Sequence, residues 1–424
     1  MPSSNPQVQR RTLATALQYM LDDPVVLIEG PRSVGKSTLL KQIASERNGR
    51  IVDLDDPAVL EAARDDPKTL IADDSLVCID EYQKAPLVLQ SLKAALNQLT
   101  QPGRFVITGS ASFDSLPLGT QALTGRVSRL RINPLSQGEI AEIHENWLER
   151  FLSESADTVA ASGRSMARRT DYVERICVGG FPLALAASSA KARDRWIDSY
   201  LAHTLQQDVR ELSRIRQETE LAAFTNRLAG QTAQVLNVEA AARSVGLNKV
   251  TASEYLSLLE HVFLMYRLPA WGKTLSSRTG KLPKVHLTDA AIAARMLRLS
   301  SEKLAVLDPT TMTEFGHLLE TFVVGEILKQ ASWLDGVQGL GHWRTHNGDE
   351  VDLVVERDDG KVAAFEVKSS TRVTDKDVKS LAKLQEKLGT GFLGGVVFYL
   401  GEYSYSVAPG LFAVPVDRLW TALS

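Results

Sequence analysis

The chain has 424 residues, and its 48 Lys and Arg against 51 Asp and Glu give a formal charge of −3. With 44% hydrophobic and 23% charged residues it can bury sizeable cores, which excludes disorder as its main state and predicts about two to four domains. The charge balance also excludes a chain that binds nucleic acid through its overall charge, so any such binding requires local basic patches.

Two cysteines, Cys78 and Cys177, are too few for a disulfide framework or a cysteine-based metal cluster, which favours a reducing cytoplasm. The chain opens on Met-Pro-Ser-Ser without a charged leader and an apolar core. Its uncharged stretches at residues 176–190 and 388–401 are shorter than the roughly 18 residues of a membrane-spanning helix. We therefore expect a cytoplasmic protein that does not cross a membrane.

Short apolar runs at residues 24–29, 51–54, 76–80 and 105–108 alternate with helix-compatible segments. This alternation predicts the parallel sheet of an α/β domain. We place that domain at residues 1–155.

The middle of the chain is predicted to be mostly helical. Residues 146–170 are polar and rich in Ser, Ala and Arg, which indicates a surface helix and a linker. We assign residues 156–230 to a helical lid and linker. Residues 236–259 then show two helices around a Val-Gly-Leu turn, and the apolar run at 263–270 can begin a wing. Residues 231–285 are therefore expected to be winged-helix-like, either as a DNA reader or as a structural packing unit.

A basic segment follows the predicted wing. Between Trp271 and Lys284 there are four cations and no acid: Lys273, Arg278, Lys281 and Lys284. Such a segment can follow a nucleic-acid backbone, and an ordinary solvated loop is the alternative.

The last part of the chain, residues 286–424, returns to mixed α/β structure. Its patterns predict helices near residues 315–330 and 373–388, and strands at 350–356, 361–368, 395–400 and 411–414. We expect these elements to form one C-terminal domain.

A glycine-rich segment follows the first predicted strand and matches G-x-x-x-x-G-K-[ST] without a mismatch. The nucleotide-binding residues that this motif predicts are Gly30, Pro31, Arg32, Ser33, Val34, Gly35, Lys36, Ser37 and Thr38. Backbone N–H groups of such a loop surround a β-phosphate at the start of the next helix. Lys36 is expected to reach the β- and γ-phosphates of ATP, and Ser37 to ligate Mg²⁺.

The strand predicted at residues 76–80 ends in two acids. Asp80 is the expected partner of Mg²⁺, and Glu81 is placed to activate the attacking water as a general base. Two acids that only cap a buried strand are the alternative. Because a simple binding switch needs only the first carboxylate, the pair favours hydrolysis.

Hydroxyls and an arginine complete the predicted nucleotide site. Thr108 and Ser110 follow the next strand, where a hydroxyl can orient the attacking water or sense the γ-phosphate; ordinary turn chemistry is the alternative. Arg126 is expected on the far side of the core, where it can act as an arginine finger in a neighbouring subunit's nucleotide site. A surface arginine in a loop is the other interpretation.

Six segments together resemble the AAA+ superfamily, in particular the bacterial and archaeal AAA-type ATPases that carry a C-terminal domain of uncertain function. The segments are GPRSVGKST, LVCIDEYQK, FVITGS, LTGR, NPLS and GGFP. The resemblance covers nearly the whole chain and implies a P-loop AAA+ core with a helical lid, ATP and Mg²⁺ as cofactors, and a homo-oligomer. Arg210 and Arg214 are the candidates for the second sensor arginine of such a lid.

Four charged residues are predicted to share one face of a C-terminal β-hairpin. The turn is centred near Asp359, so Asp352 faces Glu366 and Glu350 faces Lys368. Adjacent carboxylates repel each other unless a cation neutralises them, and oxygen ligands suit Mg²⁺ or Mn²⁺. A lysine beside such a metal can position the attacking water or stabilise a pentacovalent phosphate.

This arrangement resembles the PD-(D/E)xK nuclease fold, which is restriction-endonuclease-like. The resemblance implies that Asp352 and Glu366 bind the metal. The catalytic residues that it implies are Glu320, Asp352, Glu366 and Lys368. A cross-strand salt-bridge face, or an inactive nuclease-like scaffold that only binds, are the alternatives.

The sequence thus favours an ATP-binding and ATP-hydrolysing AAA+ ATPase coupled to a nuclease-like domain that acts on nucleic acid, with DNA favoured. The alternative is a nucleotide-controlled switch whose C-terminal domain binds protein or nucleic acid without cleavage. Both readings make ATP a ligand and further copies of the chain partners.

Overall fold

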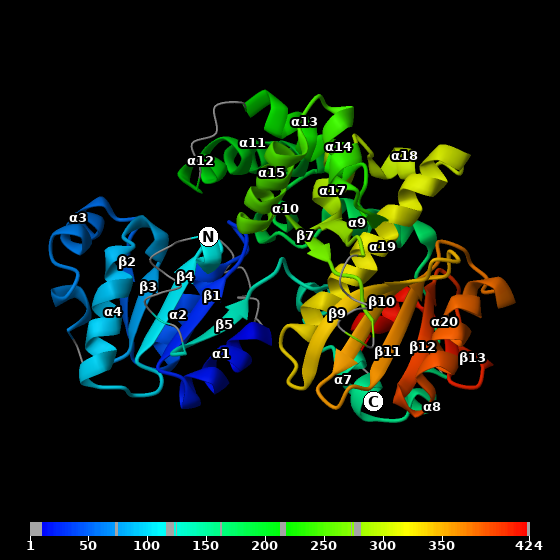
Figure 1. The fold of residues 1–424 in the computed structure, drawn as a ribbon, viewed down its shortest axis with the longest axis horizontal. Coiled ribbons are helices and arrows are strands. Elements are labelled where there is room, and N and C mark those ends of the chain that lie inside the picture. Colours follow the sequence, from blue (N-terminus) through cyan, green and yellow to red (C-terminus); the bar gives the residue numbers. More distant parts are fainter. Residues whose placement is uncertain are drawn as a thin grey trace.

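The computed structural model describes residues 11–72, 75–115, 123, 125–161, 163–212, 218–272, 274 and 281–421. Figure 1 shows an N-terminal sheet at one end of the molecule, a mostly helical middle part, and a C-terminal sheet beside the middle part. Residues that are far apart in the sequence meet where these parts join.

The N-terminal sheet has five parallel strands in the order β2-β3-β4-β1-β5. They are β1 (Val25–Glu29), β2 (Arg50–Asp53), β3 (Val77–Asp80), β4 (Phe105–Gly109) and β5 (Val127–Arg131). The alternation of apolar runs and helices therefore predicted this α/β domain correctly. Because the strands are parallel, their carboxyl ends all lie on one side of the sheet. Open α/β sheets bind their ligands on that side.

Helices cover both faces of this sheet. They are α1 (Arg11–Asp22), α2 (Lys36–Glu46), α3 (Pro57–Asp65) and α4 (Leu87–Gln98), with the 3₁₀ turns η1 (Thr69–Ile71), η2 (Tyr82–Lys84) and η3 (Phe113–Ser115). Successive side chains of a strand point to opposite faces. Val26 and Ile28 accordingly pack in one core with Leu39 of α2, while Leu27 packs in the other core with Leu92 of α4. Burial on both faces explains why these strands are continuous apolar runs.

The middle part combines helices with a small antiparallel sheet of order β6-β8-β7. Its helices are α9 (Arg169–Val178), α10 (Pro182–Leu185), α11 (Ala190–His203), the π-helix η4 (Thr204–Asp208), α12 (Val209–Leu212), α13 (Glu218–Ala229), α14 (Val238–Ser244), α15 (Lys249–His261), α17 (Ala290–Met296) and α18 (Ser301–Ala305). The strands are β6 (Gln234–Val235), β7 (Met265–Leu268) and β8 (Lys284–Leu287). α14 and α15, each capped by an asparagine, precede the antiparallel β7–β8 pair.

The C-terminal sheet is mixed and has the order β13-β14-β12-β11-β10-β9. Its elements are α19 (Pro309–Ala331), β9 (Val337–Arg344), β10 (Glu350–Arg357), β11 (Val362–Val367), α20 (Asp375–Leu388), η5 (Gly389–Gly391), β12 (Phe392–Tyr399), β13 (Tyr405–Ala408), β14 (Leu411–Pro415) and η6 (Val416–Trp420). The hairpin pairs Leu353 with Phe365 and Glu356 with Val362, which is the predicted register. β9 and β13 were not predicted.

One prediction about the middle of the chain is wrong. Instead of a surface helix, residues after 146 form α7 (Trp147–Ser153) and α8 (Ala156–Ala160), which pack against the C-terminal sheet (Figure 1). The ring of Trp147 stacks on Phe151 at 4.9 Å and meets Phe398 edge-on at 5.2 Å. The prediction failed because the four apolar residues of α7 stand in a stretch whose other residues are mostly polar.

The NPLS and GGFP segments lie where the three parts join. The backbone N–H of Leu135 donates to the carbonyl of Gly180, and the Gly180 N–H donates to Asp289 of the middle part. From the other side, Lys329 of α19 donates to the Leu135 carbonyl at 3.1 Å. α6 (Gln137–Ala141) begins there with a capping box, and the N–H of Gln137 donates to Glu326 of α19 at 2.7 Å. Buried polar contacts therefore connect the N-terminal domain to both other parts.

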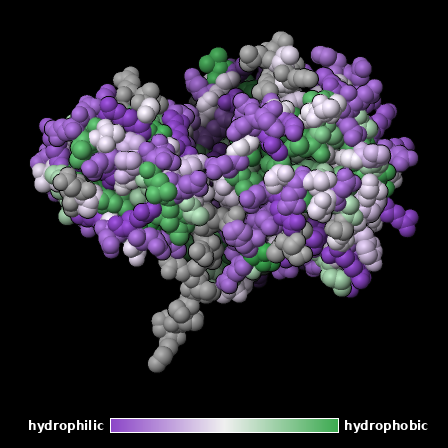
Figure 2. Space-filling model, turned by 90° about the horizontal axis from the view of Figure 1, so that it is seen from below, coloured by the Kyte–Doolittle hydropathy of each residue, from purple (hydrophilic) through white to green (hydrophobic). Residues whose placement is uncertain are grey.

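On the face drawn in Figure 2, hydrophobic residues are interspersed with hydrophilic ones. Among the described residues, the helices are all too short or too polar to cross a membrane.

Candidate functional site

The phosphate loop connects β1 to α2 at the carboxyl edge of the N-terminal sheet. Gly35 directly precedes α2 with φ 99°, a conformation that L-residues with a side chain rarely adopt. At Gly30 a Cβ atom would lie 2.1 Å from the carbonyl oxygen of Ile132, so only glycine fits there. The motif glycines thus allow the chain to turn sharply and to direct the N-terminus of an 11-residue helix at the loop.

Lys36 is the first residue of α2, and its ammonium group is buried over the loop. Its Nζ donates to the carbonyls of Gly30 at 3.1 Å and Pro31 at 2.8 Å. Burial lowers the pKa of Lys36 to about 8, against the opposing pull of Glu81 and Asp80. A ligand phosphate would offer this lysine a full negative charge in place of two neutral carbonyls.

Asp80 ends β3 beside the start of α2. The hydroxyls of Ser37 and Thr108 both hydrogen-bond its carboxylate. Burial raises the pKa of Asp80 above its ordinary value. A hydroxyl and a carboxylate are the oxygen donors that Mg²⁺ prefers, so Ser37 and Asp80 fit the predicted metal.

Glu81 follows Asp80 in a left-handed conformation with φ 54°. Its Oε2 accepts a hydrogen bond of 2.9 Å from the hydroxyl of Ser110 and another from the amide of Gln83. Gln83 also donates to Ser110 at 3.0 Å, which closes a triangle of polar groups. Gln83 was not identified as a site residue from the sequence. No pattern in the sequence indicates that its side chain turns back to Glu81.

Arg32 connects the phosphate loop to the middle part. Its guanidinium donates to Asp208 of η4 at 2.8 Å from Nη2 and 3.1 Å from Nε. His203 Nε2 lies 3.5 Å from the same carboxylate. The middle part therefore contacts the phosphate loop through Asp208. Of the two predicted sensor arginines, Arg210 lies just after Asp208 on α12, and Arg214 is outside the described residues.

Arg126 lies near the amino ends of β1 and β5, opposite to the end of the strands that carries the phosphate loop. It immediately precedes Val127, which pairs with Val25 at the start of β1, whereas the phosphate loop follows the end of β1. Its guanidinium donates to Asn97 at 2.7 Å. Arg126 therefore stands away from the phosphate loop of its own chain.

The structure brings the predicted C-terminal residues together. Asp352 on β10 accepts a hydrogen bond of 3.0 Å from the Val367 N–H on β11. Lys368 pairs with Glu366 at 2.6 Å. Glu320, from α19, faces the same cluster, which we call the carboxylate cluster: Glu320, Glu350, Asp352 and Glu366.

A second lysine, Lys284, lies inside this cluster. Its Nζ is 2.6 Å from Glu350, 2.7 Å from Glu320 and 2.9 Å from Asp352, and its side chain is 2% exposed. Two expectations are corrected. Lys284 is not part of an exposed basic segment, and Glu350 pairs with Lys284 rather than with Lys368. Of the other cations of that segment, Lys281 donates to a backbone carbonyl, while Lys273 and Arg278 lie outside the described residues.

The ionisation of the cluster follows from burial and from these contacts. Burial alone would lower the pKa of Lys284, but Asp352, Glu320 and Glu350 raise it above its ordinary value. Burial likewise opposes ionisation of Asp352, but the two lysines hold its pKa below the ordinary value. Burial raises the pKa of Glu320 strongly and that of Glu366 to about 8, with the charge of Asp352 adding to both.

The cluster as it stands does not fit a divalent metal. Within the part of the chain that the structure describes, no three His, Cys, Asp or Glu side chains are arranged to hold one. Lys284 Nζ lies between carboxylate oxygens that Mg²⁺ or Mn²⁺ would require as ligands. Glu366 Oε2 is buried without a hydrogen-bond partner, yet one free oxygen is far from the six or so that these ions take.

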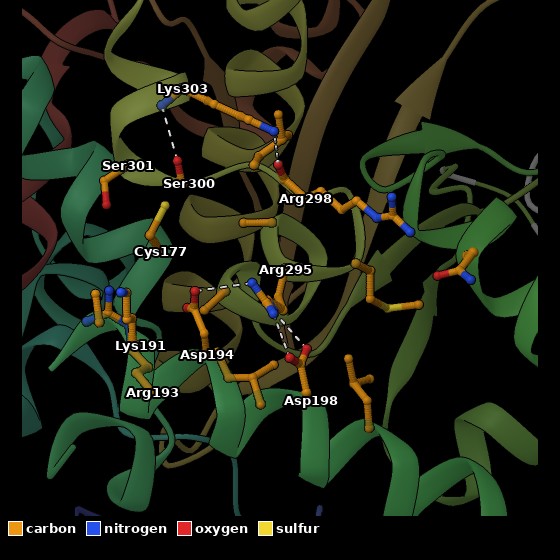
Figure 3. Close-up of a pocket in the computed structure, with 18 of the residues that line it drawn as sticks. Cys177, Lys191, Arg193, Asp194, Asp198, Arg295, Arg298, Ser300, Ser301 and Lys303 are labelled. Atoms are coloured by element: carbon orange, nitrogen blue, oxygen red, sulfur yellow. Dashed lines mark hydrogen bonds and ion pairs between the residues drawn. The ribbon is translucent and has the colours of Figure 1, made fainter. Parts of the chain in front are cut away.

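A cavity of about 1030 Å³ lies between α11, α17 and α18 of the middle part. Figure 3 shows the guanidinium of Arg295 between Asp194 and Asp198, with Cys177 and Ser301 above Asp194 in this view. The two aspartates already compensate the charge of Arg295. The sequence gave no indication of this cavity.

Comparisons with known proteins divide the chain as the structure does. Residues 22–141 match the family model described as an AAA domain. Residues 169–303 and 315–419 match two domains of unknown function, DUF8612 and DUF4143. Together, the parallel sheet, the phosphate loop and the first match define an AAA-type P-loop ATPase domain at the N-terminus.

The similar proteins named by these comparisons carry little further information. Two uncharacterized proteins, from Mycobacterium tuberculosis and Mycobacterium bovis, are each 28% identical over 98% of this chain and 85% of their own length. Among solved structures, the Walker-type ATPase of Pyrococcus abyssi overlaps 70% of this chain and 99% of its own, with 12% identity and a TM-score of 0.42. RuvB of Thermotoga maritima overlaps 62% of this chain and 90% of its own, with 20% identity and a TM-score of 0.29.

Proposed function

We propose that the protein binds ATP with Mg²⁺ and hydrolyses it at the N-terminal sheet. The observation that carries this proposal is the position of Glu81. Its carboxylate is fixed by Ser110 and Gln83 at the same edge as Lys36 and Asp80. A binding switch does not require a second carboxylate held in this way, whereas a hydrolase needs a base beside the γ-phosphate.

Each side chain has a distinct task in this proposal. Lys36 binds the β- and γ-phosphates, and Ser37 and Asp80 are the residues that would hold Mg²⁺, which neutralises phosphate charge when bound. Glu81 accepts the proton of the attacking water. Thr108 and Ser110 keep the two carboxylates oriented through the hydroxyl contacts described above.

Three variants test the ATPase. Lys36→Ala should abolish ATP binding because it removes the buried cation of the loop, while Lys41→Ala, which changes an exposed lysine of the same helix, should not. Glu81→Gln should keep ATP binding and lose hydrolysis. Equal ATP affinity in the wild type and Lys36→Ala would overturn the assignment.

We further propose that Arg126 acts in the nucleotide site of a neighbouring copy. Its distance along β1 from its own phosphate loop supports this, since a finger acting in trans must lie on another side of the domain. Arg126→Ala should keep ATP affinity and lower turnover by about 10³-fold or more. Mixing it with Glu81→Gln subunits should restore part of the activity. A fully active monomer in sedimentation and kinetics would refute the role.

For the C-terminal domain, the geometry favours binding over cutting. The gathered acids and Lys368 support a nuclease-like domain that acts on nucleic acid, with DNA favoured. Lys284 supports the alternative, a domain that binds nucleic acid or protein without cleavage while this lysine is in place. We adopt the second function because the residues present do not fit the metal that the first requires.

A cleavage assay separates the two functions. Purified protein is incubated with single- and double-stranded DNA and with Mg²⁺ or Mn²⁺, and compared with Asp352→Ala. We expect no cleavage that depends on Asp352. Cleavage by the wild type that is lost in Asp352→Ala and in Lys368→Ala would establish the nuclease instead.

A further inference from the structure

The carboxylate cluster and the cation inside it come from different parts of the molecule. Glu320 lies on α19, and Glu350 and Asp352 lie on β10 of the C-terminal sheet. Lys284 is the first residue of β8, which belongs to the three-stranded sheet of the middle part. The cluster is therefore complete only while β8 is docked against α19 and β10.

Two features make Lys284 a counter-ion rather than one member of an ordinary surface pair. Its Nζ contacts three carboxylates at 2.6 to 2.9 Å, and its side chain is 2% exposed. Surface ion pairs usually involve one partner in water and stabilise little. The ammonium of Lys284 instead compensates Glu320 and Asp352, whose side chains are only 12% and 10% exposed, and removing a cation from buried carboxylates is costly.

From this geometry we propose that Lys284 occupies the position of a divalent cation, so that the carboxylate cluster excludes metal while β8 is docked and becomes a Mg²⁺ or Mn²⁺ site when this lysine is removed. The inference rests on the proposed function of the C-terminal domain and specifies how its metal chemistry is prevented. Without the ammonium, four carboxylates carry oxygen atoms of the kind these ions bind, and Lys368, which pairs with Glu366 and acts on Asp352, is a single remaining cation for them.

The shape of the side chain also supports this assignment. Lys284 reaches the cluster from β8. Its backbone pairs there with Leu268 of β7, and the next residue, Val285, pairs with Arg267. Its ammonium is a compact charge with three N–H donors, which matches the three carboxylate partners that surround it. Arginine would carry the same charge in a larger planar group that three converging carboxylates do not match.

Mn²⁺ binding measured by electron paramagnetic resonance, without nucleotide, tests the proposal on the full chain. The variants are Lys284→Met, which keeps the stem and removes the charge, and Lys281→Met as the matched control on the preceding segment. Lys284→Met should bind one additional Mn²⁺ at least about tenfold more tightly than the wild type. Adding Asp352→Asn should abolish this gain, which separates the cluster from the Ser37–Asp80 site.

Removing Lys284 also removes a buried cation, so folding is controlled separately. The variant Lys284→Met/Glu350→Gln carries one carboxylate fewer and is predicted to stay folded. In both variants Mn²⁺ should raise the melting temperature. In the wild type, any effect of Mn²⁺ on the melting temperature should be the same with or without Asp352→Asn. Wild-type Mn²⁺ binding that is lost in Asp352→Asn would overturn the proposal, and this measurement needs no destabilised variant. A folded Lys284→Met protein without the gain would overturn it as well.

The outcome is distinguishable from that of the proposed function. If the wild type cuts DNA with metal, binding without cleavage is wrong. If it does not cut DNA, and Lys284→Met still gains no Mn²⁺, only the counter-ion role of Lys284 is wrong.

Discussion

Arg32 of the phosphate loop donates two hydrogen bonds, of 2.8 and 3.1 Å, to one carboxylate oxygen of Asp208, which lies 176 residues further along the chain. A phosphate bound in the loop would offer the same guanidinium a competing anion. We therefore expect nucleotide binding to be coupled to the position of η4 through Arg32.

This coupling predicts a change in ATP affinity. Asp208→Asn removes the competing charge, so ATP should bind more tightly, by about three- to tenfold, as measured by calorimetry with a slowly hydrolysed analogue. Asp114→Asn breaks another Arg–Asp pair on the same domain, with Arg129, and serves as the control. Identical affinities in the wild type and Asp208→Asn would show that Arg32 is not exchanged between the two anions.

The contact of Gln83 with Glu81 predicts a specific kinetic effect. Gln83→Ala leaves Glu81, the proposed base, in place but removes one of the donors that orient it, so kcat should fall by about tenfold with KM nearly unchanged. Lys84→Ala, at the next position in η2, should leave kcat unchanged. A rise in KM as large as the fall in kcat would point to a general disturbance of the loop instead.

Glu145 predicts a pH dependence of stability. Burial raises its pKa to about 7, with the charge of Glu326 acting in the same direction. The folded state therefore keeps this proton at pH values where the unfolded chain has released it. The stability contributed by the neutral form is complete below about pH 4.5 and is lost as the pH rises through about 7.

Glu145→Gln removes this titration. The unfolding free energy of Glu145→Gln minus that of the wild type should therefore rise as the pH is raised from 4.5 to 8. The total rise should be up to about 3 kcal/mol, most of it below pH 7.5. Urea unfolding at several pH values measures it. A constant difference between the two proteins across this range would contradict the raised pKa.

The aromatic contacts of α7 predict where the linker is anchored. Trp147 is fully buried against Phe151 and Phe398, so Trp147→Ala should cost about 3–5 kcal/mol of unfolding free energy in urea. Leu183→Ala, at a position that is 56% exposed, should cost little. A small effect at Trp147 would show that α7 is the surface helix that the sequence suggested.

Local patterns were sufficient for the parts of the fold that depend on neighbouring residues. The apolar runs of β1, β3 and β4 are buried on both sides, and the phosphate loop is defined by consecutive residues, so both could be predicted. The register of β10 and β11 followed from the position of their turn at Asp359. β9 was missed because its glycines, Gly339 and Gly341, and its few β-branched residues resemble a loop.

Contacts between distant segments could not be predicted in the same way. Lys284 lies 36 residues from Glu320 and 68 from Asp352, and in the sequence it ends a basic segment that looks exposed. Its burial depends on the docking of β8 against α19. Asp208 likewise reaches Arg32 only through the path of the helices between them. No periodicity or motif encodes either relationship.

The most direct test of the ATPase assignment is the release of inorganic phosphate from ATP by the purified full-length chain in Mg²⁺, measured in parallel with ATP binding for the wild type, Lys36→Ala and Glu81→Gln. We predict release by the wild type, neither binding nor release by Lys36→Ala, and binding without release by Glu81→Gln. Phosphate release at the wild-type rate by Glu81→Gln would contradict the role of Glu81, and undiminished release by Lys36→Ala would contradict the site itself.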